Sequence, residues 1–127
     1  IRKAVDGMDP FEVWGKPDIV RDVIYAVDFA RAIVMMLGHE SLKFDIFNVG
    51  TGVKTSVGDV VHWALQAAAH HPKEIRYRSD KPLTIPCRAL DTTRLRQTLG
   101  WQPAFTVEEG IRKTTDWWKA NQTTWTK

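Results

Sequence analysis

Two arginines, Arg21 and Arg88, are the residues whose chemistry points most directly to a ligand. A guanidinium presents a planar fork of N–H donors that can pair with two phosphate oxygens at once, so each can bind an anion. Lys16 is a third candidate for binding an anion, through the point charge of its ammonium group. Taken alone, each is more often a solvated surface charge or the partner of a nearby acid such as Asp22. Asp91, three residues after Arg88, is interpreted as the N-cap of a helix.

A glycine-rich segment at residues 48–52, Asn-Val-Gly-Thr-Gly, is the second candidate for chemistry. Two glycines after a strand can let the backbone approach a phosphate. A dinucleotide-binding fingerprint also needs a third glycine at a fixed spacing, and this segment does not have it. A strand-to-helix turn is therefore the favoured interpretation, and a phosphate cradle is the alternative.

Tyr77 and Lys81 have the Tyr-x-x-x-Lys spacing that, on a helix, brings a lysine beside a tyrosine hydroxyl. Pro82 follows the lysine and disfavours a helix there, so we interpret this match as accidental. The four histidines lack the cysteine and carboxylate spacing of a zinc site, and no Ser-His-Asp arrangement is apparent. We therefore expect no catalytic residue, no cofactor-binding residue and no metal ligand in this chain.

The elements that must position these residues begin with two predicted strands. Residues 11–14 and 19–25 are rich in β-branched and aromatic residues. The turn-forming stretch between them, 15–18, has the length of a hairpin connection. We therefore expect a β-hairpin that carries Arg21.

A helix is predicted next, with Asp28 as its N-cap and Gly38 as its end. Its apolar residues recur with helical spacing on one face, namely Phe29, Ile33, Met36 and Leu37. Residues 44–49 then form an apolar run that predicts a strand. The glycine-rich segment follows this strand directly.

The clearest helix signal comes after that segment. Ser56 and Asp59 approximate a capping box, and the residues behind them carry an apolar stripe that extends to residue 68. A short strand at 75–78, an irregular loop at 81–86 and a helix ending near Leu99-Gly100 are predicted after it. Thr106 begins the last helix. The whole is expected to be a small α/β domain with a β-hairpin, further short strands and about four helices.

The composition limits the possible classes of protein. The 127 residues, 26% charged and 43% hydrophobic, suit one structural unit over residues 1–127. A net charge of +3 is small for a nucleic-acid binder, and no apolar run approaches a membrane span, so neither nucleic acid nor membrane is an expected partner. The single cysteine, Cys87, and the lack of a visible signal peptide favour the cytoplasm. Because the chain opens on Ile1, a fragment or a processed form is expected.

Four stretches, in this order, resemble the C-terminal part of an extended short-chain dehydrogenase/reductase, the family of nucleotide-sugar epimerases, dehydratases and reductases. They are Val13 to Ile33 with its Arg-Asp pair, Phe47 to Ser56, Lys81 to Asp91, and Leu99 to Trp118 with Leu-Gly-Trp-Gln-Pro. Any one of these motifs is weak, but the ordered set at matching spacing is specific. The loop from Lys81 to Asp91 is most similar to the GDP-fucose synthase branch, with Cys87 where a basic residue is common.

The resemblance implies a binding role for three residues. Arg21 and Arg88 would bind the pyrophosphate of a nucleotide-diphosphate sugar from opposite sides, and Asp91 would lie near the ribose. The full-length family enzyme would use NAD or NADP. The family's N-terminal glycine motif and its Tyr-x-x-x-Lys lie upstream of the matching region, so we expect the chain alone to lack redox activity. The resemblance also places residues 44–49 in the sheet of the cofactor domain. Without that domain, this strand would leave an exposed edge.

Two hypotheses of different class follow. The first is the nucleotide-sugar-binding portion of an NAD(P)-dependent epimerase, dehydratase or reductase. The alternative is a non-catalytic binding or interaction module derived from a truncated epimerase. Such a module could self-associate as a homo-oligomer, and a further possibility is assembly with a separate cofactor domain.

Overall fold

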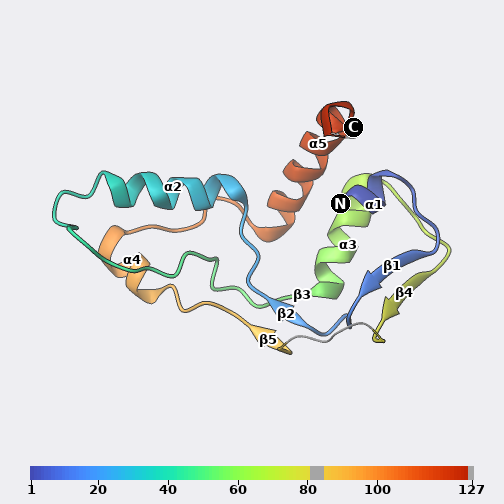
Figure 1. Ribbon diagram of the computed structural model, residues 1–127, viewed down its shortest axis with the longest axis horizontal. Coiled ribbons are helices and arrows are strands. Elements are labelled where there is room, and N and C mark those ends of the chain that lie inside the picture. Colours follow the sequence, from blue (N-terminus) through green and yellow to red (C-terminus); the bar gives the residue numbers. More distant parts are fainter. Residues whose placement is uncertain (81–84, 126–127) are drawn as a thin grey trace.

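Ten short elements make up residues 1–80 and 85–125, which the computed structural model describes (Figure 1). In chain order they are α1 (Arg2–Val5), β1 (Phe11–Trp14), β2 (Val20–Arg21), α2 (Ala26–Leu37), β3 (Thr55–Ser56), α3 (Val57–Ala68), β4 (Ile75–Arg78), β5 (Cys87–Arg88), α4 (Thr93–Leu99) and α5 (Val107–Trp125). In Figure 1 the strands run along one side, with α2 and α4 at one end and α1, α3 and α5 at the other. The predicted small α/β class is confirmed. Within the described residues, none of the helices combines the length and the apolar character that crossing a membrane requires.

The predicted hairpin is wrong, because its two strands pair with other partners. Strand β1 forms a parallel pair with β4, which lies some sixty residues later in the chain. Strand β2 covers only Val20–Arg21 and lies between β3, which is antiparallel to it, and β5, which is parallel. The sheets are thus made by contacts between segments far apart in sequence.

The start of helix α3 explains why the hairpin does not form. The first N–H groups of a helix have no partner inside it and need other acceptors. Here Val57 N donates to Ile19 O at 2.8 Å, and Gly58 N donates to Pro17 O at 2.9 Å. The segment that could have turned back along β1 instead caps α3, so β2 leaves β1 and joins a second sheet.

Two capping boxes fix the starts of α3 and α5; the sequence predicts the first of them, and for α5 it predicts the start at Thr106 but not the box. Asp59 N donates to Ser56 Oγ at 3.0 Å, and Ser56 N donates back to Asp59 Oδ2 at 3.2 Å. In the same way Thr106 N donates to Glu109 Oε2 at 2.8 Å, and Glu109 N donates to Thr106 Oγ1 at 3.2 Å. These reciprocal bonds supply acceptors for helix N–H groups at both starts.

The α5 capping box predicts an acid-dependent loss of stability. Hydrogen bonds from Thr106 lower the pKa of Glu109 below its ordinary value of 4.5, so its stabilising effect is complete above about pH 4.5 and is lost as the pH falls through the folded-state pKa. We expect Glu109→Gln to lower the melting temperature near neutral pH and to have a smaller effect at about pH 3. Thermal unfolding followed by circular dichroism at a series of pH values measures this. A difference between the two proteins that stays constant with pH would contradict it.

Helix α2 begins earlier than predicted, and Asp28 is not its N-cap. Tyr25 occupies the cap position, and Asp28 lies in the first turn with its side chain completely buried. Its carboxylate accepts hydrogen bonds from Ala104 N at 2.9 Å and Phe105 N at 3.1 Å, and from the Arg31 guanidinium at 2.7 Å. Asp28 therefore joins α2 to the segment that leads into α5, instead of satisfying α2's own N–H groups. Gly38 ends the helix as predicted.

The apolar face predicted for α2 points largely outward. Phe29 and Ile33 are more than 40% exposed and Leu37 is 83% exposed, whereas the small residue Ala32 lies fully buried on the other side. Residues 44–49 run beside this region but form no strand pairing within the described part of the chain, so the predicted strand is wrong. Its outward side chains, Phe44 and Ile46, are 89% and 72% exposed.

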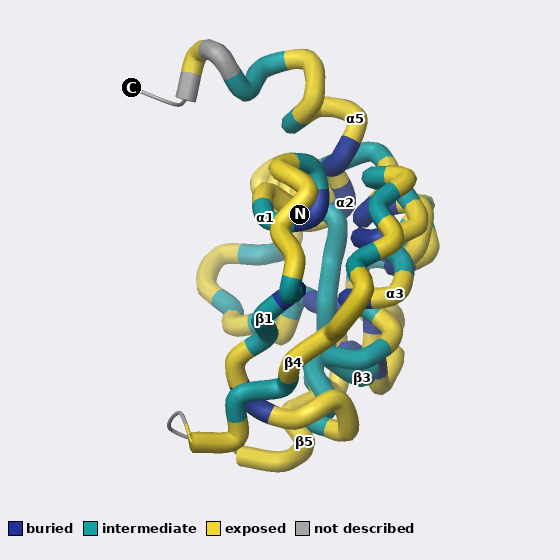
Figure 2. The backbone as a smooth tube through the Cα atoms, turned by 90° about the vertical axis from the view of Figure 1, so that its right-hand side faces the viewer, coloured by how far each residue is buried: buried dark blue, intermediate teal, exposed yellow. Residues whose placement is uncertain are grey.

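The buried residues form three small clusters. Ala4, Phe11, Val61 and Leu65 join α1, β1 and α3; Ala32, Leu95 and Trp101 join α2 to α4; and Ala64, Val107 and Ile111 join α3 to α5. In Figure 2 the buried positions are short stretches of a tube that is otherwise intermediate or exposed. The molecule is therefore held together by polar contacts between these clusters as well as by apolar packing.

Candidate functional site

Arg21 and Arg88 lie directly opposite each other on adjacent strands. The register pairs Val20 with Cys87 and Arg21 with Arg88 in the parallel ladder of β2 and β5. Residues that oppose each other in a ladder project to the same side of the sheet, on backbones about 5 Å apart. The two arginines thus lie side by side on the same face of the sheet.

The electrostatics of this pair suit an anion. Arg21 Nη1 donates to the carbonyl oxygens of Val20 and Ile85, at 2.6 and 2.9 Å, so its guanidinium is held beside the chain that enters β5. Arg88 is exposed. Like charges directly opposite each other in a sheet repel, and an anion that contacts both removes this cost. A diphosphate has the charge and the spacing of oxygens for two adjacent forks.

Asp91 lies just beyond this pair, on the segment that leads from β5 to α4. Its carboxylate accepts a hydrogen bond from Thr93 N at 2.9 Å, and hydrogen bonding by the Thr93 side chain and backbone lowers the pKa of Asp91 below its ordinary value. The N-cap of α4 is Thr92, one residue later than predicted, although Asp91 still receives the first helical N–H. Asn48 Nδ2 donates to the Asp91 carbonyl at 3.2 Å, so this segment also contacts the glycine-rich one.

The glycine-rich segment cradles a carboxylate of the protein itself. Thr51 N donates to Asp22 Oδ1 at 2.8 Å, and Gly52 N donates to Asp22 Oδ2 at 2.9 Å. Gly52 has a φ of +73°, in the left-handed region that favours glycine. The phosphate-cradle alternative is therefore wrong for these two N–H groups, because an internal anion already occupies them.

Asp22 is the residue of this region that sequence reasoning missed. The sequence suggests only that Asp22 pairs with the neighbouring arginine, whereas its side chain accepts four hydrogen bonds, two from Thr51 and one each from Gly52 and Leu90. The signal that could have found it is Gly50. A Cβ there would lie 2.8 Å from Asp22 Oδ2, so the glycine leaves room for the carboxylate.

The other sequence candidates are placed as follows. Tyr77 is on strand β4, as predicted, and Lys81 lies outside the described residues. Among residues 1–80 and 85–125, no group of three histidine, cysteine, aspartate or glutamate side chains is arranged to hold a metal ion.

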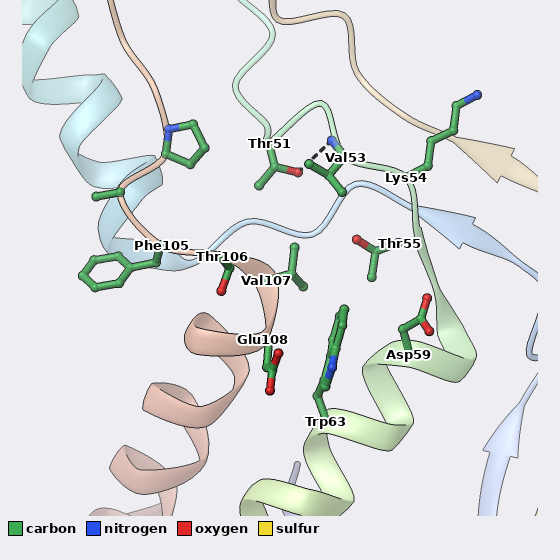
Figure 3. Close-up of a pocket in the computed structure, with 12 residues that line it drawn as sticks. Thr51, Val53, Lys54, Thr55, Asp59, Trp63, Phe105, Thr106, Val107 and Glu108 are labelled. Carbon is green, nitrogen blue, oxygen red and sulfur yellow. Dashed lines mark hydrogen bonds between the residues drawn. The ribbon is translucent and has the colours of Figure 1, made fainter.

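A separate cleft of about 470 Å³ lies between the start of α5, the exposed side of α3 and the loop that precedes β3. Figure 3 shows Trp63 standing in it between Asp59 and Glu108, with the Lys54 side chain extending away. Arg21, Arg88 and Asp91 are not among its lining residues. The cleft and the arginine pair are therefore two different places, and the sequence patterns indicated only the second.

Comparisons with known proteins agree on one family. A family model described as GDP-mannose 4,6 dehydratase matches residues 1–114. A dTDP-glucose 4,6-dehydratase from Salmonella typhimurium is 33% identical over 128 residues, which is 95% of this chain and 35% of the relative. A UDP-glucose 4-epimerase from Mycolicibacterium smegmatis is 33% identical over 108 residues, 85% of this chain and 34% of the relative.

Solved structures show the same fold. The UDP-glucose 4-epimerase from Bifidobacterium longum, in complex with NAD⁺ and UDP, superposes with a TM-score of 0.77 at 27% identity, over 94% of this chain and 38% of that one. The dTDP-glucose 4,6-dehydratase from Bacillus anthracis, in complex with NAD, gives a TM-score of 0.82 at 22% identity, over 96% of this chain and 38% of that one. The chain thus spans little more than a third of the length of these relatives. Because the family match covers most of its length, the chain belongs to the GDP-mannose 4,6-dehydratase family of extended short-chain dehydrogenase/reductase epimerases and dehydratases.

Proposed function

We propose that this chain is the nucleotide-sugar-binding portion of an NAD(P)-dependent sugar epimerase, dehydratase or reductase. Arg21 and Arg88 bind the pyrophosphate, and Asp91 lies near the ribose. The observation that carries the proposal is the direct opposition of the two arginines on β2 and β5. Two adjacent guanidinium groups neutralise a diphosphate and fix its orientation, which is what a substrate held for reaction at one sugar carbon requires.

The names of the relatives support this class of ligand. The chain is similar to enzymes named for dTDP-glucose and UDP-glucose, and one structural neighbour was solved with UDP and NAD⁺ bound. The narrower assignment to the GDP-fucose synthase branch rests on the loop from Lys81 to Asp91, part of which lies outside the described residues. It stays a prediction, and the choice of base in the experiment below tests it.

The described residues do not fit the nicotinamide cofactor. The N–H groups of Thr51 and Gly52, the glycine-rich turn of this chain, already donate to Asp22. Tyr77 lies on strand β4 and not on a helix, so it does not have the helical setting in which a Tyr-x-x-x-Lys pair works. We therefore propose that this chain binds and orients the substrate, and that by itself it does not transfer hydride.

Isothermal titration calorimetry of the 127-residue chain tests the proposal. We expect heat of binding with at least one of UDP-glucose, dTDP-glucose and GDP-mannose at millimolar ligand, and none with NAD⁺ or NADP⁺. The free nucleoside diphosphate should compete, because the pyrophosphate supplies most of the contact. A GDP-sugar preference would support the GDP-fucose synthase branch. A folded protein, shown by circular dichroism, that gives no heat with any of the three would overturn the proposal.

The exposed apolar face of α2 favours the alternative, an interaction module. Several large apolar side chains on α2 and on the neighbouring segment are open to solvent, namely Val27, Phe29, Ile33, Val34, Leu37, Phe44 and Ile46. Contiguous apolar surface of this kind marks an interface. A homo-oligomer, or assembly with a separate cofactor domain, would cover it. Light scattering after size-exclusion chromatography tests this, and a stable monomer that fails to bind a hydrophobic dye would contradict it. A cytoplasmic location likewise stays a prediction.

A further inference from the structure

The Asp22 carboxylate joins three segments that are far apart in the sequence. Its Oδ1 accepts from Thr51 N and Thr51 Oγ1, both at 2.8 Å. Its Oδ2 accepts from Gly52 N at 2.9 Å and from Leu90 N at 3.3 Å. Both oxygens therefore each serve two donors, and one side chain holds the end of β2, the glycine-rich turn and the segment after β5.

This arrangement extends the β2–β5 pairing past the end of the strands. Asp22 N donates to the Arg88 carbonyl at 3.0 Å, so the backbone of Asp22 contacts β5 directly. The side chain then holds Leu90, two residues further on. Arg21 precedes Asp22 and Arg88 precedes Leu90, so these two bonds fix the arginine-bearing segments relative to each other.

The surroundings are shaped for a carboxylate at this position. A Cβ on Gly50 would lie 2.8 Å from Asp22 Oδ2 and 2.9 Å from Cγ, closer than real contacts allow. On the other side of the turn, Arg96 Nη2 donates to the Thr51 carbonyl at 2.8 Å. The turn is thus held from both sides, and its N–H groups are kept pointing at Asp22.

We infer that Asp22 is a positioning residue for the anion site, which sets Arg88 beside Arg21 so that both guanidinium groups reach one pyrophosphate. The inference rests on the proposed function. Asp22 itself does not contact the ligand in this scheme, because its oxygens are used by N–H and O–H donors of the protein. Its contribution is preorganisation, because the two guanidinium groups are already held side by side before the ligand binds.

The substitution Asp22→Asn tests it. The amide has one oxygen and one NH₂ group, so one pair of donors loses its acceptor and faces another donor instead. We expect at least about a tenfold weaker affinity for the nucleotide sugar that the wild-type chain binds. Calorimetry with UDP-glucose, dTDP-glucose or GDP-mannose, whichever binds best, gives the dissociation constant.

A double-mutant cycle separates positioning from a general loss of structure. If Asp22 acts by placing Arg88, then Asp22→Asn should weaken binding in the wild-type background and have little further effect in an Arg88→Ala background. A purely structural role would weaken binding by the same factor in both. Asp28→Asn is the matched control, because Asp28 also accepts backbone N–H bonds but joins other segments. It should lower the melting temperature without changing affinity.

Gly50→Ala is the second variant, for the case in which Asp22→Asn does not fold. It keeps the carboxylate but displaces it, and the same loss of affinity, again absent with Arg88→Ala, is expected. The inference would be overturned if the wild-type chain binds and both Asp22→Asn and Gly50→Ala bind with the same affinity. It would also be overturned if the variants lose affinity equally in the wild-type and Arg88→Ala backgrounds. Either result would leave the proposed function in place. Absence of wild-type binding to any of the three nucleotide sugars would overturn both.

Discussion

Replacing Asp28 with alanine should lower the free energy of unfolding by about 2 to 4 kcal/mol. The side chain is completely buried and accepts hydrogen bonds from Ala104 N, Phe105 N and Arg31. Alanine leaves these donors without their acceptor and removes the tie between α2 and the start of α5. Because the buried residues form three small clusters, hydrogen bonds that join the segments of two clusters contribute a larger share of the free energy of unfolding than they would in a protein with one large core. Urea denaturation followed by far-UV circular dichroism measures the loss.

Arg31→Ala provides the control for this prediction. It removes the charged partner of Asp28 but leaves both backbone donors in place. The Arg31 side chain is 45% exposed, so the pair it forms is largely screened, and its removal should cost about 1 kcal/mol or less. Equal losses for the two variants would contradict the view that the two backbone bonds dominate.

The parts of the fold that the sequence predicts correctly are those decided by neighbouring residues. Ser56 with Asp59 fixes the start of α3 through bonds that span three residues, Thr106 stands at the start of α5, and Gly38 and Gly100 end helices locally. Such signals are complete within a short window of sequence.

The parts of the fold that the sequence does not predict depend on contacts between segments far apart in the chain. Residues 11–14 form a strand as predicted, but this strand pairs with β4, and no local sequence pattern identifies that partner. Asp28 has the sequence pattern of a cap, yet its acceptors are used by residues 104–105. The stripe of Phe29, Ile33 and Leu37 has helical spacing, but periodicity shows which residues share a face and not what covers that face.

The candidate site divides in the same way. The choice of Arg21, Arg88 and Asp91 came from a resemblance in motif order, whereas the opposition of the two arginines depends on a parallel pairing of two short strands. Strands of two residues have no periodicity from which to predict them. The only sequence signal for Asp22 is Gly50, because a Cβ at that position would collide with the Asp22 carboxylate. The sequence alone does not show which side chain occupies the space that this glycine leaves.

The largest functional effect is expected from removing both arginines. Each guanidinium that pairs with a phosphate contributes about 1.5 to 3 kcal/mol, so the Arg21→Ala, Arg88→Ala double variant should bind a nucleotide sugar at least a hundredfold more weakly, by about 1.4 kcal/mol per tenfold. Each single variant should show an intermediate loss. Calorimetry with the best-binding nucleotide sugar measures the three affinities.

Two further observations separate a specific site from a general effect of charge. Arg112→Ala changes the net charge by the same amount as either single variant. Arg112 lies on α5 in an exposed pair with Asp116, so the Arg112→Ala protein should bind the nucleotide sugar with wild-type affinity. The wild-type affinity should fall as salt rises, and the double variant should show a weaker salt dependence because its two phosphate contacts are gone. An Arg112→Ala loss as large as that of Arg88→Ala would mean that the ligand responds to net charge, and the opposition of Arg21 and Arg88 would then have no special role in binding.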